Sequence, residues 1–257
     1  MKKQAGNLPD AVSTAKTLFD IVQCVKSSNG LTVTAVAAEL DYAKSTVHRH
    51  LRTLEELGYV VEEPDGFHVG LRFLDIGQHA RDCRPGFDLA HDMVDELAQE
   101  TDERAQFLVE EHGEAVYLAR SAGDRAVQTD PGVGSRIPLH ATAAGKAILS
   151  ALHEDRLFEI IEQTTFDPIT DATVTNQETL LAELDKIRRR GYSFNRQENL
   201  DGLHAVGVPV QGTGDDVIGA LSVSGPSHRL KGEWLEKELP DLLLGAANEL
   251  ELNIAHS

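Results

Sequence analysis

Cysteine is scarce in this chain: only Cys24 and Cys83 occur among its 257 residues. Two cysteines are too few for a disulfide framework, and their spacing matches no metal-ligand motif. No apolar run approaches the roughly 18 to 20 residues that a membrane span needs. The lysines near the N-terminus are not followed by the apolar stretch of a secretory signal. The sequence therefore predicts a cytoplasmic globular protein of one large or two modest domains, with no membrane partner.

Positive charge is also scarce, and it is unevenly distributed. The chain has 24 Lys and Arg against 42 Asp and Glu, a formal net charge of −18. Residues 1–75 hold 8 Lys and Arg against 10 Asp and Glu, whereas the remaining 182 residues hold 16 against 32. Between Ala43 and Leu54 there are three basic residues and two histidines but no acid. The first third thus presents a local positive surface, while the rest of the chain repels polyanions.

The acidic excess itself has two interpretations. Few lysines combined with many Asp and Glu keep a protein soluble in concentrated salt, which suggests a salt-adapted host. An ordinary acidic cytosolic protein has a similar composition, and the sequence does not separate the two.

Residues 10–72 have the outline of a winged helix-turn-helix. Apolar spacing predicts a helix from about Ser13 to Ser28 and a short helix that Thr34 caps and that ends at Leu40. A third helix follows and ends at Gly58, a residue type that favours the left-handed conformation after a helix. The segment YVVEEPDGFHVG alternates around a turn and predicts a β-hairpin.

The third helix offers a polar outer face to a negatively charged partner. Its apolar positions Val47, Leu51, Leu54 and Leu57 fall on one side and are expected in the core, with His50 at the edge as a packing residue. The second helix of such a motif lies in the major groove of double-stranded DNA. The predicted DNA contacts are Lys44, Ser45, Thr46, His48, Arg49 and Arg52. Most charged helix faces are merely solvated, and it is the hairpin and the short capped helix that favour DNA binding here.

A helical linker is predicted over residues 73–84, and residues 85–257 interleave helices with strands. AQFLVEEHGEAVYLARS reads as two strands around His112-Gly113, and HAVGVPV and DDVIGALSVSGP read as further strands. The interleaving, without long repeats, predicts an α+β domain.

Two of these strands carry small or polar residues on one face. Alternation places Ser222 and Ser224 together with Ala220 on one side of the last strand, and Ala205 with Gly207 on one side of the strand before it. Small residues leave room for a ligand that hydroxyl groups could orient. The alternative is that glycine and alanine only allow a helix to pack closely.

The combined motifs resemble those of the isocitrate lyase regulator (IclR) family of transcription factors. The resemblance rests on YAKSTVHRHLRTLEELGYV and FHVGLRFLDIG, and on PLHATAAGKAILSAL, RRRGYSFNRQENLDGLHAVGVPV and VIGALSVSGPSHRL. It implies a winged helix-turn-helix joined to a GAF-like α/β effector-binding domain, in a homodimer or a dimer of dimers. The family's effectors are often small organic acids. Positions that match the family's effector site are Ala143, Ala144, Asn195, Leu203, Ala205, Ser222 and Ser224.

The sequence departs from the family pattern at three positions. His50 stands where an apolar residue is usual, Asn195 where an acidic residue is common, and Ala205 where a cysteine is frequent. Neutral Asn195 removes a local negative charge, which predicts a site at least as tolerant of anionic ligands.

No catalytic constellation emerges, and no cofactor or metal is expected. The segment AAGKA lacks the glycine spacing and the hydroxyl residue of a phosphate-binding loop, and SVSGPS lacks the elbow of a serine hydrolase. His48 and His50 diverge on a helix and cannot easily share a metal. The leading prediction is a DNA-binding regulator controlled by a metabolite. The alternatives are a second domain that serves only as a dimerisation scaffold, and an enzyme with a regulatory domain.

Overall fold

The computed structural model describes residues 12–28, 30–84, 86–126, 132–214 and 216–256. The chain divides into two compact units, with the division between Ala80 and Arg81. The domain limits expected at residues 10, 85 and 257 fall outside the described residues. No helix within the described ranges is long and apolar enough to cross a membrane.

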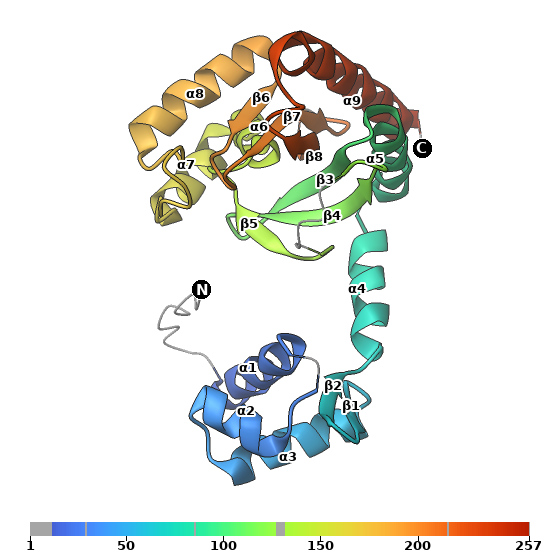
Figure 1. Cartoon of the computed structure of the whole chain (residues 1–257), viewed down its shortest axis with the longest axis vertical. Coiled ribbons are helices and arrows are strands. Elements are labelled where there is room, and N and C mark those ends of the chain that lie inside the picture. The colour runs from blue at the N-terminus through green and yellow to red at the C-terminus, as the bar shows by residue number, and fades with distance from the viewer. Residues whose placement is uncertain (1–11, 29, 85, 127–131, 215, 257) are drawn as a thin grey trace. The chain divides into compact units, whose positions relative to one another are not determined.

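The first unit is a three-helix bundle with a β-hairpin, as the sequence predicted (Figure 1). Its elements are α1 (Ser13–Lys26), α2 (Val33–Leu40), α3 (Lys44–Glu56), β1 (Val60–Glu63) and β2 (Gly66–Val69). The core draws one apolar face from each helix, including Ile21, Val36 and Leu51, all fully buried. The hairpin joins this core through Phe67, whose backbone pairs with Leu31.

Two details of the first unit differ from the expectation. Thr32, rather than Thr34, caps α2, because its hydroxyl accepts a hydrogen bond from the Ala35 amide at 3.3 Å. Leu57 is 50% exposed instead of buried. Helix α3 ends at Glu56, so the helical periodicity that was extended to Leu57 stops one residue earlier.

Helix α4 (Arg72–Asp82) follows the hairpin where a linker helix was predicted. None of its residues is buried: Leu74 and Ile76 in its first turns are 57% and 48% exposed, and Leu71, which directly precedes the helix, is 83% exposed. Phe73 packs against the core of the first unit, whereas Leu74 and Ile76 leave an apolar side of the helix exposed.

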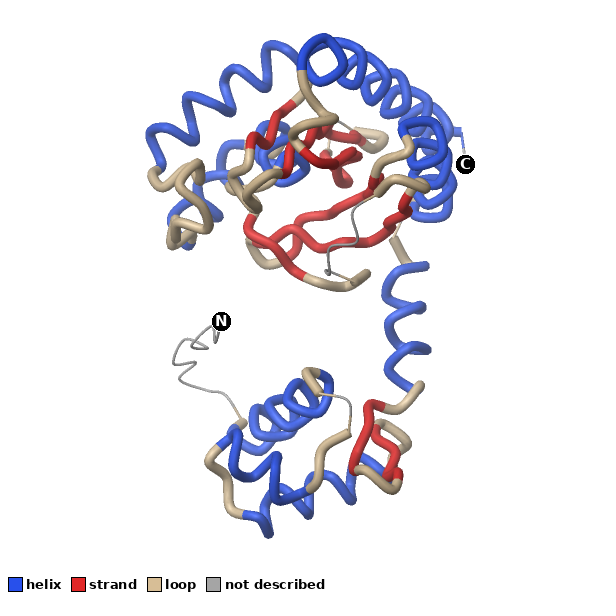
Figure 2. Tube along the Cα trace, in the orientation of Figure 1, coloured by secondary structure: helices blue, strands red, loops and turns tan. Residues whose placement is uncertain are grey.

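The second unit is built on a six-stranded antiparallel sheet in the order β5-β4-β3-β8-β7-β6, drawn red in Figure 2. The strands are β3 (Arg104–Glu111), β4 (Glu114–Ala122), β5 (Arg136–Pro138), β6 (Ser193–Arg196), β7 (Leu203–Gln211) and β8 (Val217–Pro226). The four longer strands were predicted. The short strands β5 and β6 were not, because three- and four-residue strands carry too little alternation to stand out.

Helices cover both faces of this sheet (Figure 1). One core lies between the sheet and the pair α5 (Phe87–Thr101) and α9 (Leu239–His256). The other lies against α6 (Ala143–Ala151), α7 (Glu154–Gln163) and α8 (Gln177–Arg190). A π-helical turn (Trp234–Glu238) precedes α9 and places Pro240 in its first turn, where proline is tolerated.

Helix α6 packs directly on the backbone of β7, because Gly207 has no side chain. A Cβ on Gly207 would lie 2.7 Å from the carbonyl carbon of Ala143 and 2.7 Å from the amide nitrogen of Ala144. Gly245, on α9, has no such neighbour: no atom lies within 4 Å of an added Cβ there.

We therefore expect opposite effects from the same substitution at these two glycines. Gly207→Ala should destabilise the second unit by about 1–3 kcal/mol because the methyl group overpacks the helix–strand contact. Gly245→Ala should stabilise it by about 0.5–1 kcal/mol through helix propensity. Urea unfolding followed by fluorescence of Trp234, the single tryptophan, measures both. Wild-type stability of the Gly207 variant would contradict the packing described.

Candidate functional site: helix α3 and a pocket at the sheet

The polar face of α3 is open to solvent. Thr46 is half-buried, whereas the other predicted contacts are exposed: Lys44, Ser45, His48, Arg49 and Arg52. His50 is half-buried, which fits its expected place at the edge of the core. Basic side chains and hydroxyls of this kind are the types that bind phosphates and base edges in protein–DNA complexes.

Arg52 differs from the other exposed bases because it already binds two carboxylates. Its Nη1 donates to Oε2 of Glu55 at 2.6 Å and to Oε2 of Glu62 at 2.7 Å. The guanidinium also lies 5.7 Å from the ring centre of Phe67. Glu62 and Phe67 are partners in the hairpin register, so they lie side by side facing α3. Arg52 thus ties the helix to the hairpin, a role that its position on the helix did not indicate.

Arg72 closes the C-terminal end of α3. Its Nη1 donates to the Leu57 carbonyl at 2.5 Å, and its guanidinium lies 5.0 Å from the ring centre of Tyr59. A cation at this end complements the helix dipole and binds a carbonyl that the helix leaves without an amide partner. Arg72 therefore helps to hold α3 in place, although it is not one of the predicted DNA contacts.

In the second unit, the predicted effector residues surround one pocket of about 180 Å³. A space of this volume can hold several waters or a small metabolite. All seven positions matched to the family line the pocket: Ala143, Ala144, Asn195, Leu203, Ala205, Ser222 and Ser224. The remaining lining residues, which were not among the predicted positions, are Arg104, Gln106, Leu108, Tyr117, Ile137, Thr142, Asn199 and Leu200.

Arg104 is the cation of this pocket. It is 5% exposed, and burial first, then repulsion from Arg120, lowers the pKa of its guanidinium, which starts so high that the group stays charged at neutral pH. None of the residues that line the pocket is acidic. The sequence contains a pattern that indicates this residue: alternation in RAQFLVEE places Arg104 and Gln106 on one face of a strand. In the sheet, their register partners are Ser224 and Ser222.

Hydrogen bonds hold the polar side chains of the pocket in place. Asn195 donates through Nδ2 to the Ala141 carbonyl at 2.9 Å and accepts through Oδ1 from the Glu198 amide at 2.9 Å. Ser222 Oγ donates to the Val206 carbonyl at 2.8 Å, and Gln106 Nε2 donates to Ser224 Oγ at 3.4 Å. These groups are pre-oriented around the space that a ligand would enter.

A buried ion pair lies next to the pocket. Lys146, on α6, is 2% exposed and donates to both carboxylate oxygens of Glu198, at 2.7 Å and 2.5 Å. Its charge is therefore neutralised inside the protein, as buried charges require. The lysine of the AAGKA segment thus holds the chain after β6 rather than presenting itself to a phosphate group.

These two arrangements define a helix-turn-helix transcriptional regulator. The family description "IclR helix-turn-helix domain" matches residues 15–64, and "Bacterial transcriptional regulator IclR C-terminal" matches residues 86–252. The chain belongs to the IclR family of transcriptional regulators. The family resemblance and the fold class predicted from the sequence are thereby confirmed.

Full-length relatives agree with this assignment. A protein of Halobacterium salinarum named "Probable HTH-type transcriptional regulator ArcR" is 30% identical over 250 residues, covering 96% of this chain and 95% of that protein. The regulator KdgR of Escherichia coli K12 is 29% identical with the same coverage. These relatives are named as transcriptional regulators and not as enzymes.

Solved structures show the same fold. The crystal structure of the Thermotoga maritima IclR superimposes with a TM-score of 0.80 at 28% identity, covering 94% of this chain and 98% of the other. An IclR homolog from Microbacterium hydrocarbonoxydans, solved in complex with 4-hydroxybenzoate, superimposes with a TM-score of 0.79 at 22% identity, covering 95% of this chain and 100% of the other.

Exposure of Arg49 on α3 leads to the first DNA-binding prediction. Arg49→Ala should weaken binding to the operator by about 1–3 kcal/mol, roughly 5- to 150-fold, because an arginine that bonds a base edge contributes that much discrimination. Gel shifts at fixed salt measure the loss. Lys16→Ala removes an exposed base from α1 and is the control, which should bind nearly as wild type. An unchanged affinity of Arg49→Ala would show that α3 is not the reading helix.

The contact between Arg52 and the hairpin leads to a second prediction. Glu62→Gln should tighten DNA binding roughly 2- to 5-fold and steepen its salt dependence, because Arg52 loses a competing carboxylate and becomes available to a phosphate. Glu56→Gln removes the same charge from an exposed position of α3 and controls for net charge. Titrations at several salt concentrations compare the two, and an equal gain in both variants would contradict a specific role of Glu62.

Proposed function

We propose that a small organic acid, bound in the pocket of the second unit, controls the affinity of this regulator for its operator. The observation that carries the proposal is the buried Arg104 in a pocket lined by no acidic residue. The unit around it belongs to the strongly acidic part of the chain. A fixed cation within such a unit selects a compact anion that enters the pocket and does not attract polyanions to the surface.

The opposite side of the pocket also favours an anion. Helix α6 begins there, and Thr142 caps it by accepting from the Gly145 amide at 3.1 Å. Amides at a helix N-terminus complement negative charge, and Ala143 and Ala144 bring no side chain that would block them. The related M. hydrocarbonoxydans protein was solved with 4-hydroxybenzoate, an aromatic acid. We therefore expect a carboxylate between Arg104 and the start of α6, with the serines of β8 selecting its polar groups.

Control of DNA affinity requires more than one copy of the chain. An effector changes operator affinity only if it favours one relative placement of paired DNA-binding units. We propose a homodimer or a dimer of dimers, acting on double-stranded DNA in the cytoplasm at half-sites related by a two-fold axis. The exposed leucines and isoleucine at the start of α4 support a second copy of the chain as the partner of that helix.

The experiment is a gel shift on the DNA upstream of the protein's own gene, with a panel of carboxylates that includes 4-hydroxybenzoate. At least one acid should change the affinity at constant ionic strength. If the second unit serves only as a dimerisation scaffold, no acid changes the affinity although the DNA still shifts. If the chain is an enzyme, an acid is converted during incubation, which chromatography of the mixture reveals.

Arg104 gives the sharpest test of the ligand class. Arg104→Gln should weaken the active acid roughly 10- to 150-fold, the value of about 1.5–3 kcal/mol for a hydrogen bond to a charged group. Arg104→Lys keeps the charge and should retain most of the affinity. Isothermal titration measures both, and equal affinities in wild type and Arg104→Gln would exclude an acid bound to this side chain.

Asn195→Asp is a poorer test of the same idea. The Asn195 amide donates to the Ala141 carbonyl, so an aspartate at this position would place a carboxylate against that oxygen. Any loss of ligand affinity would then mix electrostatic repulsion with local unfolding of the pocket.

A further inference from the structure

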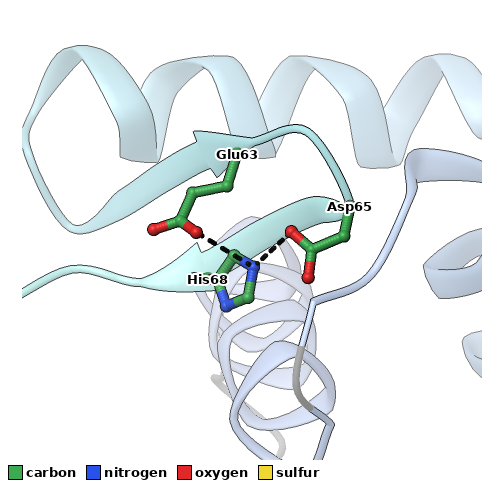
Figure 3. Close-up of side chains that lie close together, drawn as sticks. All are labelled: Glu63, Asp65 and His68. Atoms are coloured by element: carbon green, nitrogen blue, oxygen red, sulfur yellow. Dashed lines mark hydrogen bonds and ion pairs between the residues drawn. The ribbon is translucent and has the colours of Figure 1, made fainter.

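The tip of the hairpin brings three metal-ligating side chains together (Figure 3). Glu63 ends β1, Asp65 lies in the turn and His68 lies on β2. Nε2 of His68 is 2.9 Å from Oδ1 of Asp65 and 3.9 Å from Oε2 of Glu63. His68 pairs with Val61 in the hairpin register, so Glu63, two residues further along, is its diagonal neighbour on the same face.

The spacing of the ligand atoms suits one small cation. The three ligand atoms all lie within 4.8 Å of one another. Zinc binds nitrogen and oxygen at about 2.0–2.2 Å, which places two ligand atoms of a tetrahedral site about 3.3 Å apart. The distances from His68 to the two carboxylates lie on either side of this value. Small side-chain rotations, without movement of the backbone, would therefore complete the coordination.

The surroundings of the cluster hold it together. A Cβ on Gly30 would lie 2.7 Å from Oδ2 of Asp65 and 3.0 Å from Nε2 of His68, so the loop before α2 closes one side with a residue that has no side chain. The backbone of Leu31 exchanges two hydrogen bonds with Phe67, at 3.2 Å and 2.8 Å. These bonds fix the hairpin against the core, and the imidazole is correspondingly only 21% exposed.

We propose that Glu63, Asp65 and His68 form a binding site for a divalent transition-metal ion of the Zn²⁺ class. One imidazole nitrogen and two carboxylate oxygens match the ligand preference of Zn²⁺ and Co²⁺, whereas Mg²⁺ and Ca²⁺ prefer oxygen ligands alone. A bound divalent ion cancels the charge of the two carboxylates at the hairpin tip and keeps an open coordination position toward solvent. No metal is expected from the sequence alone, because Glu63 and His68 are neighbours only through the pairing of the two hairpin strands.

The test uses the full chain and the metal alone. Isothermal titration with Zn²⁺ in a non-chelating buffer, with Co²⁺ absorption as a spectroscopic check, should show a site in the wild type whose affinity falls at least roughly 10-fold in His68→Gln. His91→Gln is the matched control: His91 and Asp95 form a half-buried histidine–carboxylate pair, 3.8 Å apart, and no third ligating group joins them among the described residues. Its affinity should equal that of the wild type.

A second variant guards against misfolding. Asp65→Asn keeps the shape of the turn residue and should lose affinity by a similar factor, with far-UV circular dichroism reporting the fold of each variant. Equal Zn²⁺ affinity in wild type and His68→Gln, or an equal loss in His91→Gln, overturns the proposal. The result is independent of the pocket in the second unit, because neither experiment uses an organic acid.

Discussion

The second unit depends on the direct contact between helix α6 and the backbone of β7. Gly207 allows the approach, and Ser193 strengthens it because its Oγ donates to the Ala143 carbonyl at 2.6 Å and lies 3.1 Å from the Gly207 carbonyl. Once α6 starts at this point, the next small residue of the strand, Ala205, leaves a gap instead of a contact. The pocket is the space beside this close helix–strand contact. Small residues therefore have both expected effects on one face of β7: Gly207 allows close packing, and Ala205, two residues before it, leaves room for a ligand.

Charge in this protein is separated by location. The acidic excess lies in the second part of the chain, whereas the charged residue that lines the pocket there is the cation Arg104. In the first unit, the polar side of α3 is exposed and basic, while the hairpin beside it is acidic and takes up Arg52 through Glu62. The available positive surface is therefore narrower than the composition of α3 suggests, and a pair of such surfaces makes a better ligand for DNA than a single one.

Much of the fold followed from periodicity, whereas the site depended on resemblance and register. Each long helix or strand has enough periodicity to be predicted on its own, and the Pro-Asp-Gly turn predicts the hairpin. Strands β5 and β6 are too short for this, and Leu57 was misplaced because periodicity does not mark where a helix stops. Arg104 could have been found from the alternation of β3, but only the pairing of β3 with β8 shows that it meets Ser224. Interactions across strands, such as His68 with Glu63, depend on turn geometry that spacing alone leaves open.

The pairing of β3 with β8 has a consequence for synthesis. Residue partners in this pairing, such as Arg104 and Ser224, are 120 positions apart in the chain, whereas the first unit is complete within the first 80 residues. A chain emerging from the ribosome can therefore form its helix-turn-helix long before β8 exists to close the pocket. A truncated product that ends before β8 would therefore keep the helix-turn-helix and lack the strand that completes the pocket.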